Sequence, residues 1–175
     1  MKYLAISGSL RKASLNTALL KATEHLLPEA TRMEIATLEN LPILNPDDLE
    51  SGFPQVVNEL ANKIKQADAL VLATPEFNYS VTAALKNAID WLSIHPDAPL
   101  KHKPTAIMSA GPGLFGGARA QYQLRQILIY PDAKLLNVPE VMVGGADKFN
   151  DQGELVDAQS KELIRQQMIA LHKLI

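Results

Sequence analysis

Short apolar segments alternate with segments of helical periodicity along the chain, and this alternation constrains the fold more than any other feature. The apolar segments predict five strands, at residues 4–7, 31–36, 69–74, 105–109 and an interrupted 134–138 plus 141–143. The periodic segments predict five helices, at residues 15–27, 54–66, 81–92, 118–129 and, after an N-cap at Asp157, 158–175. We therefore expect an α/β fold, a doubly wound five-stranded parallel sheet with helices on both faces and right-handed crossovers.

The length and composition are those of one globular domain, which we expect to span residues 1–175. A net charge of −2 gives no reason to expect nucleic acid or an anionic membrane as a partner. The chain has no cysteine, which excludes disulfides, thiolate zinc sites, iron–sulfur clusters and a cysteine nucleophile. We find no leader segment and no apolar run of membrane-spanning length, so we expect a cytoplasmic protein.

Three turns are the candidate binding segments. In a doubly wound sheet, ligands bind beyond the carboxyl ends of the strands, where the strand order reverses. The turns at residues 8–16, 75–80 and 110–117 follow the first, third and fourth predicted strands. We expect them to form one site, and the irregular stretches 38–53 and 139–156 to be shaped loops that cover part of the molecule.

The first turn, ISGSLRKASLN, has the composition of an anion site. It opens a helix, whose free N–H groups and positive dipole end attract anions, and it carries Ser9, Arg11, Ser14 and Asn16. A dinucleotide turn needs a second glycine where this chain has Leu10, and the Gly-Lys-Ser/Thr of a P-loop is missing. The turn therefore favours a single terminal phosphate. The alternative is that its serines only shape the turn and Arg11 is a solvated surface charge.

The second turn, TPEFNYS, follows the most apolar strand. Pro75 ends that strand, and Glu76, Phe77 and Asn78 follow with amides that no sheet ladder needs. Such a loop can offer N–H and C=O groups to the edge of a flat heterocycle, with Phe77 beside its face. The alternative is a plain connection in which Asn78 or Ser80 caps the next helix.

The third turn has four glycines between Gly111 and Gly117. Glycines permit positive φ angles and a close approach of the backbone to a ligand. The same turn carries Leu114 and Phe115, apolar side chains on a loop tip that often meet a ligand or a partner chain. A flexible connection is the alternative, but the three turns at one sheet edge together favour a binding site.

Three motifs, GSLRKASLN, TPEFNYSVTAALKNAIDWLS and GGARAQYQLRQ, resemble the NAD(P)H-dependent FMN reductases in order and separation. The resemblance extends from residue 1 to about residue 126, and it is to the branch that contains bacterial quinone, chromate and azo-compound reductases. It implies a flavodoxin-like fold with strand order 2-1-3-4-5 and one FMN per subunit.

The resemblance also assigns cofactor contacts. It implies that the FMN phosphate is bound by the residues of the first motif: Ser9, Arg11, Ser14 and Asn16. It implies that the isoalloxazine is lined by Pro75, Glu76, Phe77 and Asn78, with Ser109 and Gly111 near its pyrimidine side. Phe77 stands where the family usually has tyrosine, so this position keeps the ring and lacks the hydroxyl.

The implied chemistry has two steps: NADPH or NADH reduces the flavin and leaves, and a quinone, chromate, azo compound or free flavin then takes two electrons. The flavin carries the reaction, so no catalytic side chain is expected. Indeed the chain has no G-x-S-x-G motif, no H-E-x-x-H motif and no histidine pair at metal-ligand spacing. The family forms dimers or tetramers, so we expect at least a homodimer. Trp91 would then lie either at a subunit interface or in the peripheral core.

Two other functions remain open at this point. A flavodoxin-like electron carrier would bind FMN without oxidising NAD(P)H, but such carriers are strongly acidic, and this chain is nearly neutral. A non-enzymatic sensor with the same fold is disfavoured by the three intact turns. The sequence does not distinguish NADPH from NADH or identify the physiological acceptor.

Overall fold

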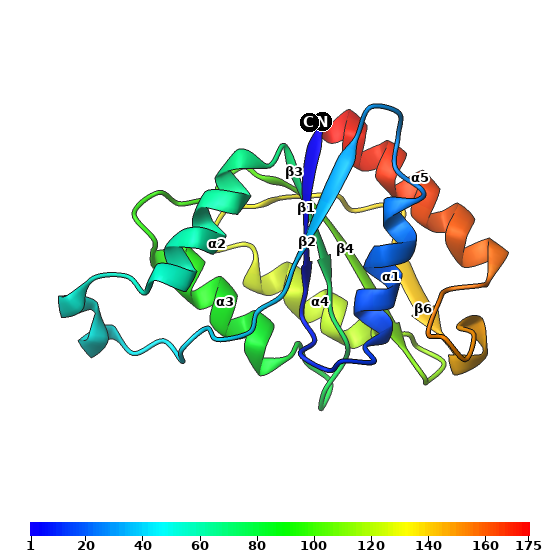
Figure 1. Ribbon diagram of the computed structural model, residues 1–175, viewed down its shortest axis with the longest axis horizontal. Coiled ribbons are helices and arrows are strands. Elements are labelled where there is room, and N and C mark those ends of the chain that lie inside the picture. Colours follow the sequence, from blue (N-terminus) through cyan, green and yellow to red (C-terminus); the bar gives the residue numbers. More distant parts are fainter.

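The computed structural model describes residues 1–175, and a parallel sheet forms its centre (Figure 1). The strands are β1 (Lys2–Ser7), β2 (Arg32–Ala36), β3 (Ala69–Ala73), β4 (Pro104–Gly111), β5 (Lys134–Leu135) and β6 (Val141–Gly144). The sheet order is β2-β1-β3-β4-β5, and β6 also pairs with β4. The predicted order 2-1-3-4-5 is confirmed.

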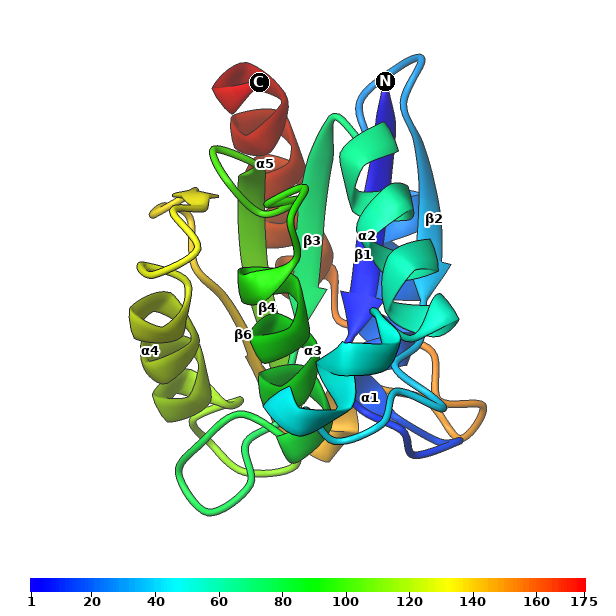
Figure 2. The same ribbon diagram turned by 90° about the vertical axis from the view of Figure 1, so that its left-hand side faces the viewer.

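The fifth strand position is interrupted, as the sequence predicted. β5 pairs with Pro104 and Thr105 at the start of β4, and β6 pairs in parallel with the far end of β4, from Met108 to Gly111. Figure 2 shows β6 beside β4. Residues 136–140 lie between the two pieces, so this edge of β4 lacks a ladder partner near Ile107.

Helices cover both faces of the sheet. α1 (Leu15–Glu24) and α5 (Ala158–Leu174) pack on one face, and α2 (Gln55–Gln66), α3 (Ala83–Ile94) and α4 (Ala118–Ile127) pack on the other (Figure 1). Alternate residues of β1 divide between two buried clusters: Leu4 and Ile6 join one, Tyr3 and Ala5 the other. This alternation confirms the doubly wound arrangement. No helix is both long and apolar enough to cross a bilayer.

Two 3₁₀ turns, η1 (Pro46–Ser51) and η2 (Ala146–Lys148), lie in the stretches predicted to be irregular. The stretch that contains η1 is tied to α3 by side chains. The Trp91 indole N–H donates to Pro42 O at 2.8 Å, and Asn87 donates to the same oxygen while accepting from Leu44 N. Trp91 is only 1% exposed, which favours the peripheral-core alternative for this residue.

Substituting Trp91→Phe should lower the free energy of unfolding by about 1–2 kcal/mol, because it removes a buried hydrogen bond and part of a packed ring. Urea unfolding measures the change, and limited proteolysis within residues 38–53 should become faster. Ser93→Ala is the control, because Ser93 Oγ makes only a local bond to Asp90 O. Equal stability of the two variants would contradict the anchoring role of Trp91.

Candidate functional site

One cavity of about 450 Å³ opens at the carboxyl ends of β1, β3 and β4, the edge where Figure 2 shows the connecting turns. Its volume lies in the range of small-molecule sites, roughly 300–1,000 Å³. The lining includes most of the residues singled out in the sequence: Ser9, Arg11, Ser14, Asn16, Pro75, Glu76, Phe77 and Gly111. The structure thus brings the three turns together around one space.

The first turn presents unused donors to this cavity. The backbone N–H groups of Ser14, Leu15 and Asn16, which line it, have no acceptor within the chain. The oxygens of Ser9 and Ser14 accept from Arg11 N and Thr17 N, which leaves both hydroxyl hydrogens free to donate. The Arg11 side chain is exposed and makes no ion pair or hydrogen bond. With the N-terminus of α1, this group of donors suits an anion with several oxygens.

Asn16 connects this turn to β4. Its side chain is 2% exposed, and its amide donates to Ala110 O and accepts from Ala110 N, both at 2.9 Å. β3 ends opposite Met108, so Ala110 has no ladder partner on that side. The Asn16 amide takes the place of the missing strand, so this side chain is held on β4 while the backbone N–H of Asn16 has no acceptor within the chain.

Gly8 brings the first turn against the second. Its N–H donates to Ala73 O at 2.7 Å, and its carbonyl accepts from Thr82 Oγ1 at 2.6 Å. A Cβ at this position would lie 3.1 Å from Ala73 O and 3.2 Å from a methyl of Leu85, closer than ordinary contact. The close approach therefore favours glycine here, since a larger residue would need Ala73 or Leu85 to shift by a few tenths of an ångström.

The second turn is a two-residue hairpin. Phe77 and Ser80 exchange both backbone hydrogen bonds, at 3.0 and 2.9 Å, and Asn78 and Tyr79 have φ angles of 49° and 65°. Asn78 therefore lies at the hairpin tip and does not line the cavity. The alternative that Asn78 or Ser80 caps the next helix is wrong, because Thr82 is the N-cap of α3 and accepts from Leu85 N.

An ion pair joins the second and third turns. The carboxylate of Glu76, whose side chain is 12% exposed, lies 2.5 Å from Arg119 Nη2 and accepts from Arg119 N at 3.1 Å. The N-cap of α4 is Gly117, which has no side chain, so Glu76 satisfies the first turn of α4 from another loop. The Arg119 guanidinium also lies 3.8 Å from the centre of the Tyr79 ring.

Arg119 lines the cavity but was not predicted to do so from the sequence. The one local signal for it was its position just after the glycine-rich turn. The resemblance implied that Ser109 lies near the pyrimidine side of the flavin, and the structure buries Ser109 completely behind the third turn, outside the cavity lining. There Ser109 contacts Gln121, which sequence reasoning did not assign to the site.

Comparison with known proteins agrees with this geometry. A family model described as NADPH-dependent FMN reductase matches residues 1–148. The chain belongs to this family. It is 48% identical over 172 residues to an NAD(P)H-dependent FMN reductase of Pseudomonas aeruginosa, a match that covers 98% of this chain and 93% of the relative. It is 40% identical over 179 residues to a quinone reductase of Escherichia coli, covering 100% and 95% of the two chains.

Among solved structures, FerB of Paracoccus denitrificans, a flavoenzyme NAD(P)H:acceptor oxidoreductase, matches with a TM-score of 0.88 and 30% identity, covering 99% of this chain and 96% of that one. The chain is therefore a flavodoxin-like NAD(P)H-dependent FMN reductase, an oxidoreductase with FMN as its cofactor.

In this FMN reductase, Asn16→Leu should lower the free energy of unfolding by about 2–4 kcal/mol, because both polar groups of buried Ala110 lose their partner. Urea unfolding without added FMN measures the loss. Ser9→Ala in the same turn is the control, with an expected change below about 0.5 kcal/mol. An equally small change for Asn16→Leu would contradict its role as a strand substitute.

Proposed function

We propose that FMN binds in this cavity with its phosphate at the first turn and its isoalloxazine between the second and third turns. The observation that carries the proposal is the group of unused donors on Ser9, Arg11 and residues 14–16, which line the cavity that the other two turns enclose. The free backbone N–H groups of Ser14, Leu15 and Asn16, two serine hydroxyls and Arg11 suit a terminal phosphate.

The ring end of the cavity fits a flat heterocycle. The Glu76 N–H has no acceptor within the chain, and a Cβ at Gly111 or Gly113 would meet no atom of the protein. Phe77 is 62% exposed beside this space, so its ring can stand next to a bound ligand without moving. Ser109 and Asn78 do not line the cavity. Ser109 holds the third turn through its hydrogen bond to Gly116 O, and Asn78 forms the tip of the hairpin in the second turn.

The proposed reaction is a ping-pong exchange at one open face. FMN, when bound, supplies the two-electron chemistry, accepting a hydride from NADH or NADPH and passing an electron pair to a second substrate. The chain itself contributes binding and orientation: the first turn holds the phosphate, and the exposed rings of Phe77 and Phe115 flank the opening through which both substrates enter in turn. The cytoplasm, where NADH and NADPH are produced, is the location that we propose.

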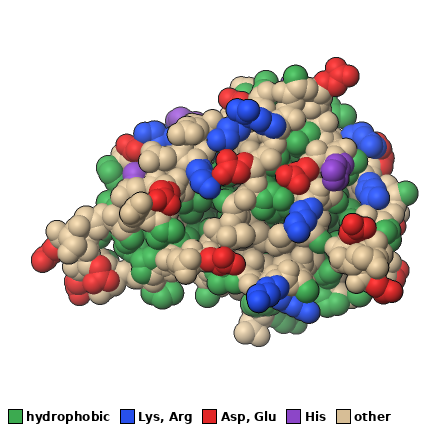
Figure 3. Space-filling view, viewed as in Figure 1, with side chains coloured by type: hydrophobic (Ala, Val, Ile, Leu, Met, Phe, Trp, Pro, Cys, Tyr) green, Lys and Arg blue, Asp and Glu red, His purple; other side chains and the backbone are tan.

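Quinones are the acceptors that we propose first, since a relative 40% identical over the whole chain is named a quinone reductase. An open flavin face also suits chromate, azo compounds and free flavin. The electron-carrier alternative has less support, because the net charge is −2 and Figure 3 shows basic and acidic side chains interspersed on the face it draws.

Anaerobic absorption spectroscopy tests the reaction. The FMN-loaded protein should lose its visible flavin absorbance when NADPH or NADH is added, and regain it when a benzoquinone follows. A flavin that binds but is not reduced by either nucleotide would refute the reductase and support the electron carrier.

Replacing Arg11 by alanine should raise the dissociation constant of FMN roughly ten- to a hundredfold, since a charged hydrogen bond to the phosphate is lost. Quenching of flavin fluorescence measures the constant, and circular dichroism checks the fold. Lys12→Ala is the matched control, because Lys12 lies in the same turn but outside the cavity lining. Equal effects of the two substitutions would show that Arg11 acts only through the overall charge of the turn.

We also propose a homodimer or homotetramer. Exposed apolar side chains gather on the third turn and around α4: Leu114, Phe115, Tyr122, Ile129 and Tyr130. Light scattering at micromolar concentration should give at least twice the chain mass of 19.1 kDa. A mass of one chain would refute the proposal.

A further inference from the structure

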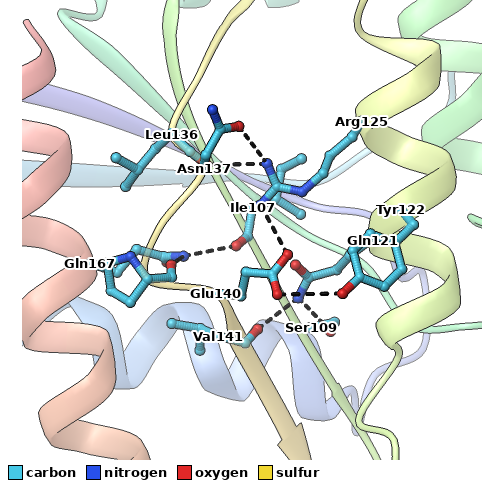
Figure 4. Close-up of polar contacts among 11 residues, drawn as sticks. Ile107, Ser109, Gln121, Tyr122, Arg125, Leu136, Asn137, Glu140, Val141 and Gln167 are labelled. Carbon is cyan, nitrogen blue, oxygen red and sulfur yellow. Dashed lines mark hydrogen bonds and ion pairs between the residues drawn. The ribbon is translucent and has the colours of Figure 1, made fainter.

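Behind the third turn, a chain of buried hydrogen bonds links α4 to the loop that lines the cavity. Gln121 Nε2 donates to Ser109 Oγ at 2.7 Å, and Ser109 Oγ donates to Gly116 O at 2.5 Å. Gln121 Nε2 also donates to Val141 O at 2.7 Å, as Figure 4 shows. Gln121 and Ser109 are completely buried.

The direction of these bonds is fixed by their partners. Val141 O and Gly116 O can only accept, so Gln121 must present its NH₂ group and Ser109 must turn its hydroxyl hydrogen toward Gly116. The Gln121 Oε1 atom is left buried without a partner. A buried oxygen without a partner is unfavourable. It is offset here because both hydrogens of the Gln121 amide are used, one toward Val141 O and the other to orient Ser109.

The loop that receives this bond is packed tightly onto the end of β6. A Cβ at Gly144 would overlap Leu114 O, and a Cβ at Gly116 would lie 2.8 Å from Gly144 N, which is also closer than atoms can pack. Gly145 N donates to Gly111 O at 3.1 Å. Gly116 and its neighbours line the cavity on their other side. The position of the backbone there therefore sets one wall of the cavity.

We propose that Gln121, acting through Ser109, is a positioning residue that holds the 113–117 loop against the flavin and so sets the affinity for FMN. Neither side chain touches the cavity, and the effect passes through Gly116 O. The inference rests on the proposed placement of FMN between the second and third turns.

The chain contains a matched control in Gln167. This side chain is 1% exposed, its Nε2 donates to Ile107 O at 3.0 Å and to Pro139 O at 2.9 Å, and its Oε1 also lacks a partner (Figure 4). Gln167 therefore has the same burial and the same use of its amide as Gln121. It differs in contacting no residue of the cavity loop.

The experiment compares Gln121→Met with Gln167→Met, and adds Ser109→Ala as a second, smaller change at the same hydrogen-bond chain. Two quantities are measured in the full-length protein: amide hydrogen exchange of residues 113–117 without FMN, and the dissociation constant of FMN by fluorescence quenching. Gln121→Met and Ser109→Ala should each speed exchange of the loop and raise the dissociation constant roughly tenfold. Gln167→Met should change neither, although it lowers stability to urea as much as Gln121→Met does.

Combining Gln121→Met with Ser109→Ala should add little to either single effect, because both break the same chain of bonds. Unchanged loop exchange in Ser109→Ala, or an equal loss of FMN affinity in Gln167→Met, would overturn the positioning role. Faster loop exchange with unchanged FMN affinity would instead refute the placement of the flavin against this loop.

Discussion

The site depends on how the carboxyl end of β4 is paired after β3 has ended. β3 reaches only Met108 of β4, and the Asn16 amide then takes over both polar groups of Ala110. This pair fixes the start of α1 against β4, because an unpaired buried peptide would cost more than the ordering of one side chain. The first turn is therefore held in place by β4, and its own backbone N–H groups remain free for a ligand.

The same substitution of side chains for missing strand recurs on the opposite edge of β4. Between β5 and β6, where β4 has no ladder partner, Gln167 donates to Ile107 O (Figure 4). The Glu76 carboxylate likewise completes the first turn of α4. Polar side chains thus satisfy backbone groups at three places where the regular sheet or helix stops, and two of these, at Asn16 and Glu76, line the cavity. Hydrogen bonds within the protein fix the walls of the cavity, and the donors that remain unused lie on the first turn.

Local periodicity and the positions of glycine and proline predicted the parallel sheet, the interrupted fifth strand and the three turns. The sheet order was implied by the resemblance to the FMN reductases. The sequence did not reveal that Asn78 sits at a hairpin tip or that Ser109 is buried behind the loop. It also missed Arg119 and Gln121, whose partners Glu76 and Ser109 lie 43 and 12 residues away. Such pairings depend on how loops fold over the sheet edge, which no local pattern encodes.

A crystal structure of the protein with FMN tests the central claim most directly, the placement of the cofactor. We expect phosphate oxygens within hydrogen-bond distance of the backbone nitrogens of Ser14, Leu15 and Asn16, with the isoalloxazine between Glu76 and Gly111. A phosphate bound at the other end of the cavity, beside Arg119, with the first turn left without a ligand, would contradict it.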